Sequence, residues 1–171
     1  MEAEQINALQ KMFEYNRWAN EQLITICAGL DENQLGNEVE VVFGQIRPTL
    51  VHQIRSEGGY AGRLAGKRLW PDDLAWDQMS FEQLLEKSCE SGDRLIEICT
   101  QADPAKKHEE EHLGLPIYFF NWTVLLQALY HGIEHRTQIK ILLTQLGVEH
   151  PDLAAWDYVE SLPVNGHRDD L

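Results

Sequence analysis

The stretch "LLQALYHGIEHRTQIKILL", residues 125–143, is predominantly apolar and is typical of a buried helix, yet it carries two histidines. At about 100° per residue, His131 and His135 fall on one arc of this helix. Apolar side chains share that arc: Val124, Ala128, Ile139 and Leu142. Arg136 and Lys140 fall on the opposite side, which predicts an outer charged face. Burying an imidazole costs free energy unless it finds a partner, so the two inward histidines need an explanation.

Two interpretations of the histidine pair are open. Two imidazoles at positions i and i+4 can chelate one metal ion, and the cores of helix bundles often hold such sites. Alternatively, both are neutral core histidines that are hydrogen-bonded to Glu134, to Gln138 or to a backbone carbonyl. The helix alone does not choose between them, and a metal site needs a third ligand from elsewhere in the chain.

Four long segments have the apolar spacing of helices, at about residues 4–29, 44–66, 80–103 and 121–147. The third opens on Ser80 with Gln83 three residues later, which is a capping-box arrangement. Gly147 is well placed to end the fourth. Together the four segments predict an all-α fold in which the helices form an antiparallel bundle.

The connections between these segments differ in length. Residues 30–43 and 67–79 are rich in Asp, Asn, Gly and Pro, which predicts loops. Residues 104–120 form a longer crossover before the fourth helix, and "LPIYFF" within it is compatible with a short strand. After Pro151, the sequence "DLAAWDYVES" predicts a short C-terminal helix packed on the body, and Trp18, Trp122 and Trp156 are expected to be core or packing residues.

The overall composition indicates one domain over residues 1–171. The chain has 14 Lys+Arg against 28 Asp+Glu, a formal net charge of −14, which disfavours binding to nucleic acid and to anionic membranes. The longest apolar run contains polar residues, so no membrane span is expected. Three cysteines without a CxxC pair and an acidic N-terminus without signal-peptide character predict a reduced, cytoplasmic protein.

His52, on the second helical segment, is the candidate for a third metal ligand. Most apolar residues of that segment centre on the arc opposite His52, which shares its side with small and polar residues such as Ser56 and Gly59. This pattern describes a surface histidine more often than a ligand. The alternative is that the small, polar face lines a wet cleft between helices, and periodicity does not distinguish the two.

The segment "HEEEH", His108 to His112, matches the H-E-x-x-H signature of zinc metalloproteases, with Glu109 in the place of the general base. That mechanism requires the motif on a buried helix with apolar neighbours. Here the segment is acidic throughout and runs into "LGLP". A metalloprotease that uses His108, Glu109 and His112 is therefore only a remote alternative.

Four segments in order resemble the DinB-like (damage-inducible) metalloprotein family. They are "YNRWANEQL" at 15–23, "TLVHQIRSEGGYAGRLAG" at 49–66, "LYHGIEHRTQI" at 129–139 and "PDLAAWDYVES" at 151–161. The resemblance covers almost the whole chain, and four motifs in the right order are far more specific than any one of them. Tyr60 stands where the family often has tryptophan, which is a modest departure.

The resemblance implies a four-helix bundle of up-down-down-up order and one divalent metal ion, zinc, nickel or iron. It also implies three histidine ligands, which match His52, His131 and His135. Family members are often homodimers, and characterised relatives include transferases and isomerases that use low-molecular-weight thiols such as bacillithiol and mycothiol. The position of Glu57 in the motif implies a structural hydrogen bond or a role in orienting the ligands.

Three neutral imidazoles would leave a fourth coordination position open, as in catalytic zinc sites. The expected function is therefore a metal-dependent enzyme acting on a small molecule, either a thiol S-transferase or a hydrolase; the alternative is a metal-binding, dimerising bundle without catalysis. Glu134 or Gln138 could orient the imidazoles. Arg63 is either a binding residue for a substrate carboxylate or an ordinary surface arginine. The adjacent Gly58 and Gly59 either open space beside the metal or allow a close approach of helices.

Overall fold

The computed structural model describes residues 7–36 and 44–163, which are mostly helical. The four long helices are α1 (Ala8–Cys27), α3 (Ile46–Ala65), α4 (Phe81–Cys99) and α5 (Asn121–Gln145). The shorter elements are α2 (Glu32–Leu35), the 3-10 helix η1 (Trp76–Gln78), α6 (Ala155–Ser161) and the strands β1 (Lys107–His112) and β2 (Leu115–Phe120). None of the described helices combines the length and the apolar character needed to cross a membrane.

The helix ends follow local sequence signals. Ser80 caps α4, and its hydroxyl accepts a hydrogen bond from the backbone N–H of Gln83 while the Gln83 side chain accepts from the Ser80 N–H, so the predicted capping box is confirmed. Gly66 ends α3 with φ +70°, and Gly147 follows α5 with φ +69°, a backbone conformation that glycine adopts without steric cost. α1 begins after Asn7, so the expected start near residue 4 lies outside the described residues.

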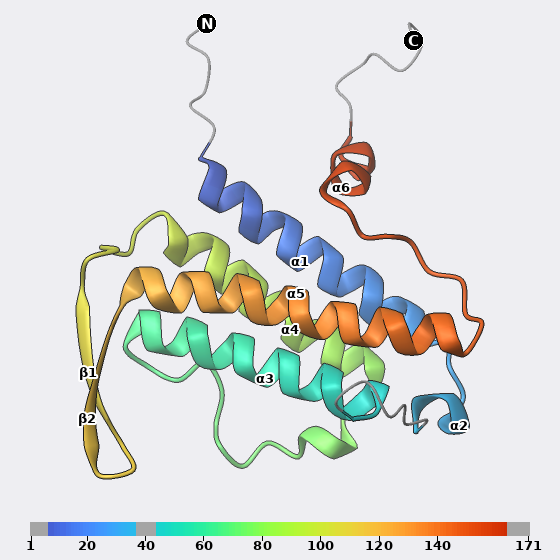
Figure 1. The fold of residues 1–171 in the computed structure, drawn as a ribbon, viewed down its shortest axis with the longest axis horizontal. Helices are drawn as coiled ribbons and strands as arrows, with labels where there is room; N and C mark the ends of the chain where they lie inside the picture. The colour runs from blue at the N-terminus through green and yellow to red at the C-terminus, as the bar shows by residue number, and fades with distance from the viewer. Residues whose placement is uncertain (1–6, 37–43, 164–171) are drawn as a thin grey trace, which may run out of the picture.

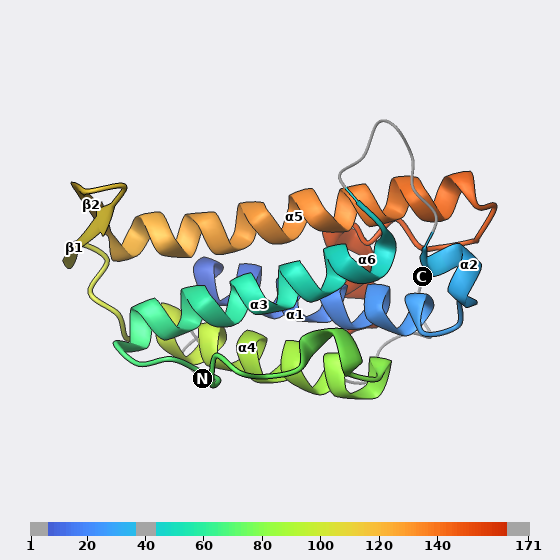
Figure 2. The same ribbon diagram turned by 90° about the horizontal axis from the view of Figure 1, so that it is seen from below.

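The long helices lie side by side, and each contacts two others closely. α1 and α3 both pack against α4 and α5, and Figure 2 shows α5 and α4 on opposite sides with α1 and α3 between them. The colours in Figure 1 show that α1 and α5 run in one direction and α3 and α4 in the other. Fully buried aliphatic side chains from all four helices fill the space between them: Leu23, Leu50, Leu84, Leu95, Ile139 and Leu142.

A β-hairpin projects from one end of the helices, before the start of α5 (Figure 1). The strands are antiparallel, with Lys107 opposite Phe120 and His112 opposite Leu115. The two residues between them, Leu113 and Gly114, both have positive φ, as a tight two-residue hairpin requires. The expected strand at "LPIYFF" is confirmed, whereas its partner "KHEEEH" was not anticipated, so the all-α prediction omitted this small sheet.

The predicted orientation of α5 is wrong in part. Arg136 was expected on the outer face, but it is buried with 4% of its surface exposed. The buried arc of α5 is centred near Gly132 and Ile139, roughly 90° around the helix from His131. His131 therefore lies at the edge of the buried arc, because α5 packs between α1 and α3 rather than against one neighbour.

The three tryptophans that were expected to be core or packing residues differ in their exposure. Trp122 on α5 is 51% exposed and Trp156 on α6 is 80% exposed, so neither lies in the core, although the Trp122 ring stacks on that of Phe120. Trp18 does pack against the core, and its ring contacts those of Tyr15 and Tyr158. The outer face of α5 instead presents an apolar stripe of Trp122, Leu126, Tyr130, Ile133 and Ile141.

Candidate metal centre

The structure brings together the three histidines of the predicted site. His131 and His135 are one turn apart on α5, and their Nε2 atoms are 3.1 Å apart. His52 projects from the adjacent α3, which places its Nε2 atom 3.1 Å from that of His131. The three ligand atoms all lie within 4.8 Å of one another. The apolar pattern of α3 favoured a surface position for His52, and the face that carries this residue is exposed. Because that face also borders α5, His52 still lies close to the other two histidines.

The donor set fits a divalent transition metal. A tetrahedral zinc ion with Zn–N bonds of about 2.0–2.1 Å separates two ligand nitrogens by about 3.3 Å, close to the distances seen here. Imidazole nitrogens also suit nickel and iron. Throughout the described part of the chain, no other group of three or more histidine, cysteine or acidic side chains converges in this way.

The charge state of the histidines is also suited to metal binding. Burial, together with smaller effects of the neighbouring imidazoles of His135 and His52, lowers the pKa of His131 to about 4. Burial likewise lowers the pKa of His52, with smaller effects from His135 and Arg55. Neutral imidazoles are the form that binds metal, so the lowered pKa values of His131 and His52 favour metal binding at these two ligands.

Gln138 contacts one of the three imidazoles. The Nδ1 atom of His135 lies 2.7 Å from the side-chain oxygen of Gln138, which accepts a hydrogen bond from Nδ1–H. This bond fixes the tautomer that leaves Nε2 free to bind a metal. Glu134, the other side chain expected to orient the imidazoles, is exposed, and no contact between it and a histidine is seen in the described residues.

A buried polar network behind the site accounts for Glu57. Its carboxylate accepts hydrogen bonds from Asn16 and Asn20 on α1, each at 2.9 Å, and from Ser91 on α4 at 2.8 Å. Burial raises the pKa of Glu57, and these hydrogen bonds partly oppose the change. The Arg136 guanidinium donates to the oxygens of both asparagines. Glu57 therefore joins three helices and does not point at the histidines.

The two glycines of α3 have different surroundings. A β-carbon at Gly58 would lie 2.0 Å from the ring of Trp70, so this glycine allows the loop after α3 to approach the helix. A β-carbon at Gly59 would meet nothing within 4 Å. Close approach therefore explains Gly58, although the approaching group is a loop and not a helix, whereas Gly59 faces open space.

The sequence interpretation gave no role at the site to two residues that lie beside the histidines. Tyr60 meets the His131 ring edge-on, with 5.6 Å between the ring centroids. Arg55 lies one turn beyond His52 and lines a cavity with it. Arg55 is three residues and Tyr60 eight residues after His52. This spacing places each of them on the side of α3 that carries His52, so it could have identified both.

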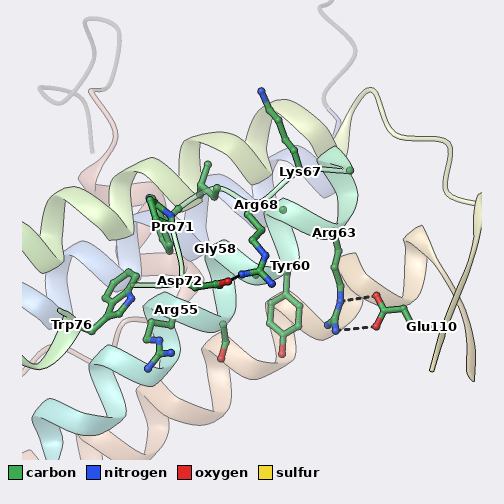
Figure 3. Close-up of a pocket in the computed structure, with 16 residues that line it drawn as sticks. Arg55, Gly58, Tyr60, Arg63, Lys67, Arg68, Pro71, Asp72, Trp76 and Glu110 are labelled. Carbon is green, nitrogen blue, oxygen red and sulfur yellow. Dashed lines mark hydrogen bonds and ion pairs between the residues drawn. The ribbon is translucent and has the colours of Figure 1, made fainter. Parts of the chain in front are cut away.

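Arg63 lies farther along that face, about 16 Å from His52 by helical rise. Its guanidinium pairs with the Glu110 carboxylate of the hairpin (Figure 3). It also lies over the Phe119 ring. It is therefore separate from the three histidines.

The structure does not support the H-E-x-x-H alternative. His108 and His112 lie on β1 and not on a helix, and residues four apart on a strand are separated by about 13 Å. His108 is hydrogen-bonded to Asn121 and stacks on Phe119. The strand therefore lacks the one-turn helical spacing with which the H-E-x-x-H motif places both histidines on one zinc ion.

The fold and the site thus define a predominantly helical protein with a cluster of three histidines on two neighbouring helices. The sequence model of the DinB family matches residues 4–165, and the chain belongs to that family. It is 28% identical over 147 residues to Protein DinB of Bacillus subtilis (strain 168), an alignment that covers 80% of this chain and 85% of that protein.

Proposed function

We propose that the protein is a metal-dependent enzyme that holds one divalent ion, zinc, nickel or iron, on His52, His131 and His135. Its reaction would be a thiol S-transfer or a hydrolysis on a small-molecule substrate. The convergence of the three Nε2 atoms is the observation that carries the proposal. We further propose that the four long helices form the up-down-down-up bundle of the family, as a single domain over residues 1–171.

The chain's own residues would leave one side of the ion accessible. Three protein ligands do not complete a four-coordinate site, and the exposed position of His52 gives a substrate access from solvent. Gln138 would hold the His135 ring in place. When bound, the ion would lower the pKa of a thiol or water and so provide a nucleophile at neutral pH.

The alternative from a different class is a metal-binding, dimerising bundle without catalysis. The apolar outer face of α5 favours self-association, since exposed apolar stripes of this kind commonly mark interfaces. We propose a homodimer through this face for either function. Self-association is thus compatible with both, and only turnover distinguishes them.

Metal analysis of untagged protein is the first test of the site. We expect about one divalent ion per chain in the wild type and a large loss in His52→Ala and His131→Ala. His150→Ala removes a half-buried histidine outside the cluster and should leave the metal in place, as should His108→Ala. If all five proteins carry the same sub-stoichiometric metal, the three-histidine site is wrong.

Turnover is tested separately, with thiols and electrophiles or hydrolysable esters offered to metal-loaded and metal-stripped protein. Metal-dependent turnover that His131→Ala abolishes would support the enzyme. Stoichiometric metal without turnover across a broad panel would favour the non-catalytic alternative.

A further inference from the structure

A cavity of about 680 Å³ lies on the exposed side of α3 and the loop that follows it (Figure 3). From α3 it is lined by Arg55, Ser56, Gly59, Tyr60 and Arg63. A second cavity of about 450 Å³ shares Arg55 and Ser56 with the first and is also lined by His52. The two cavities are therefore neighbours along α3, and together they lead from His52 to Arg63.

The larger cavity is positively charged in a strongly acidic protein. Its lining includes four of the 14 basic residues of the chain but only two acidic ones, Asp72 and Glu110. Figure 3 shows the guanidinium groups of Arg55, Arg63 and Arg68 along one side of the cavity, whereas the Lys67 side chain points away from them. An anion approaching a protein of net charge −14 would therefore find a local positive potential at this face.

Two of these arginines already bind carboxylates of the chain itself. The Nε and Nη2 atoms of Arg63 donate to the two oxygens of Glu110, each at 3.2 Å, which is the two-pronged geometry in which arginine recognises a carboxylate. Arg68 pairs with Asp72. Both pairs are solvent-exposed, and exposed ion pairs are weak, so a ligand carboxylate could replace either partner.

Arg55, the arginine nearest to His52, is in a different state. Within residues 7–36 and 44–163, no carboxylate pairs with it, and its guanidinium lies 5.9 Å from the centroid of the Trp76 ring. Tyr60 connects the cavity to the histidines, because it lines the cavity and also contacts the His131 ring. No atom lies within 4 Å of the place that a β-carbon at Gly59 would take, so the cavity is open at this position.

We propose that this cavity binds a small, elongated ligand that carries at least two carboxylates. One carboxylate would pair with Arg55 beside the histidines, and the other with Arg63 in place of Glu110. Arg55 and Arg63 are eight residues apart on one helix, about 12 Å by helical rise, which sets the approximate length of the ligand. Only the identification of this ligand as the substrate rests on the proposed function, since the arginines bind without the metal.

The test is a calorimetric titration of the full-length protein at low ionic strength, before and after chelation of metal. The probes are sebacate, a ten-carbon dicarboxylate, and its uncharged diamide. We expect sebacate to bind at least about tenfold more tightly than the diamide, with or without metal. Arg63→Met should weaken sebacate binding about tenfold, and Glu110→Gln should strengthen it, because it removes the competing carboxylate.

Arg94→Met is the matched control, since this arginine of α4 pairs with Glu97 outside the cavity and its loss should leave binding unchanged. Equal affinity for sebacate and the diamide would overturn the proposal, as would equal effects of Arg63→Met and Arg94→Met. Unaltered binding in Glu110→Gln would remove the role given to Arg63. If the protein binds sebacate but carries no metal as purified and takes up none when zinc, nickel or iron is added, the anion site is upheld and the proposed function fails.

Discussion

Replacing Arg136 with methionine is a direct test of the buried network that joins α1, α3 and α5. Its Nη1 atom donates hydrogen bonds to Asn16 Oδ1 at 2.7 Å and to Asn20 Oδ1 at 2.5 Å. Methionine fills a similar volume but donates nothing. The Asn16 oxygen would then lose this charged donor, while Asn20 would keep only the donor from Gln53.

The structure sets the size of the effect. Two hydrogen bonds from a charged donor contribute about 3–6 kcal/mol together. Burial of Arg136 opposes this gain, because it lowers the pKa of the guanidinium and leaves Nη2 without a partner among the described residues. We therefore expect Arg136→Met to lower the free energy of unfolding by about 3 kcal/mol, or Tm by about 6–12 °C in a chain of this length.

Urea denaturation followed by circular dichroism measures this change. Arg94→Met provides the control, because it removes an arginine from an exposed ion pair and should cost at most about 1 kcal/mol. A loss below about 1 kcal/mol for Arg136→Met would refute the buried position and restore the outward orientation that the helical wheel predicts.

Three further predictions concern the glycines, the buried carboxyl and the outer face of α5. Gly58→Ala should destabilise the protein by about 1–3 kcal/mol through its clash with Trp70, whereas Gly59→Ala should stabilise it by up to about 1 kcal/mol, and equal effects in thermal melts would contradict the assigned contacts. Because burial raises the pKa of Glu57, its contribution to stability is present below the ordinary carboxyl pKa and is lost as pH rises through the raised value. Urea titrations from about pH 4 to 7 should therefore show stability falling with pH relative to Glu57→Gln, and parallel profiles would disprove this. Ile133→Glu should convert a dimer to a monomer in light scattering, and a monomeric wild type would exclude the proposed interface.

The sequence predicted features that depend on neighbours along the chain. The four long helices, the cap at Ser80 and the glycine at the end of α3 all follow from local hydrogen bonding and backbone preference. The pairing of His131 with His135 is equally local, because one helical turn sets it. His52 required the family resemblance, since nothing within α3 indicates which neighbouring helix its exposed face borders.

The features that the sequence did not predict depend on packing between distant segments. The side of α5 that faces the core is decided by α1 and α3 together, so a wheel centred on the histidines placed Arg136 outside. The acidic composition of "KHEEEH" gave no sign of a strand, and β1 forms because β2 and a tight turn complete its hydrogen bonding. The cationic cavity is likewise invisible in the sequence, because Arg68 comes from the loop after α3 and Glu110 from the hairpin.

X-ray absorption spectroscopy of zinc-loaded protein tests the central claim, that three histidines hold one ion, most directly. The structure predicts a first shell with three imidazole nitrogens at about 2.0–2.1 Å from the zinc and one further light atom. His131→Ala should lose this shell, and His150→Ala should keep it. A first shell with sulfur at about 2.3 Å, or one without imidazole scattering, would contradict the assignment of His52, His131 and His135.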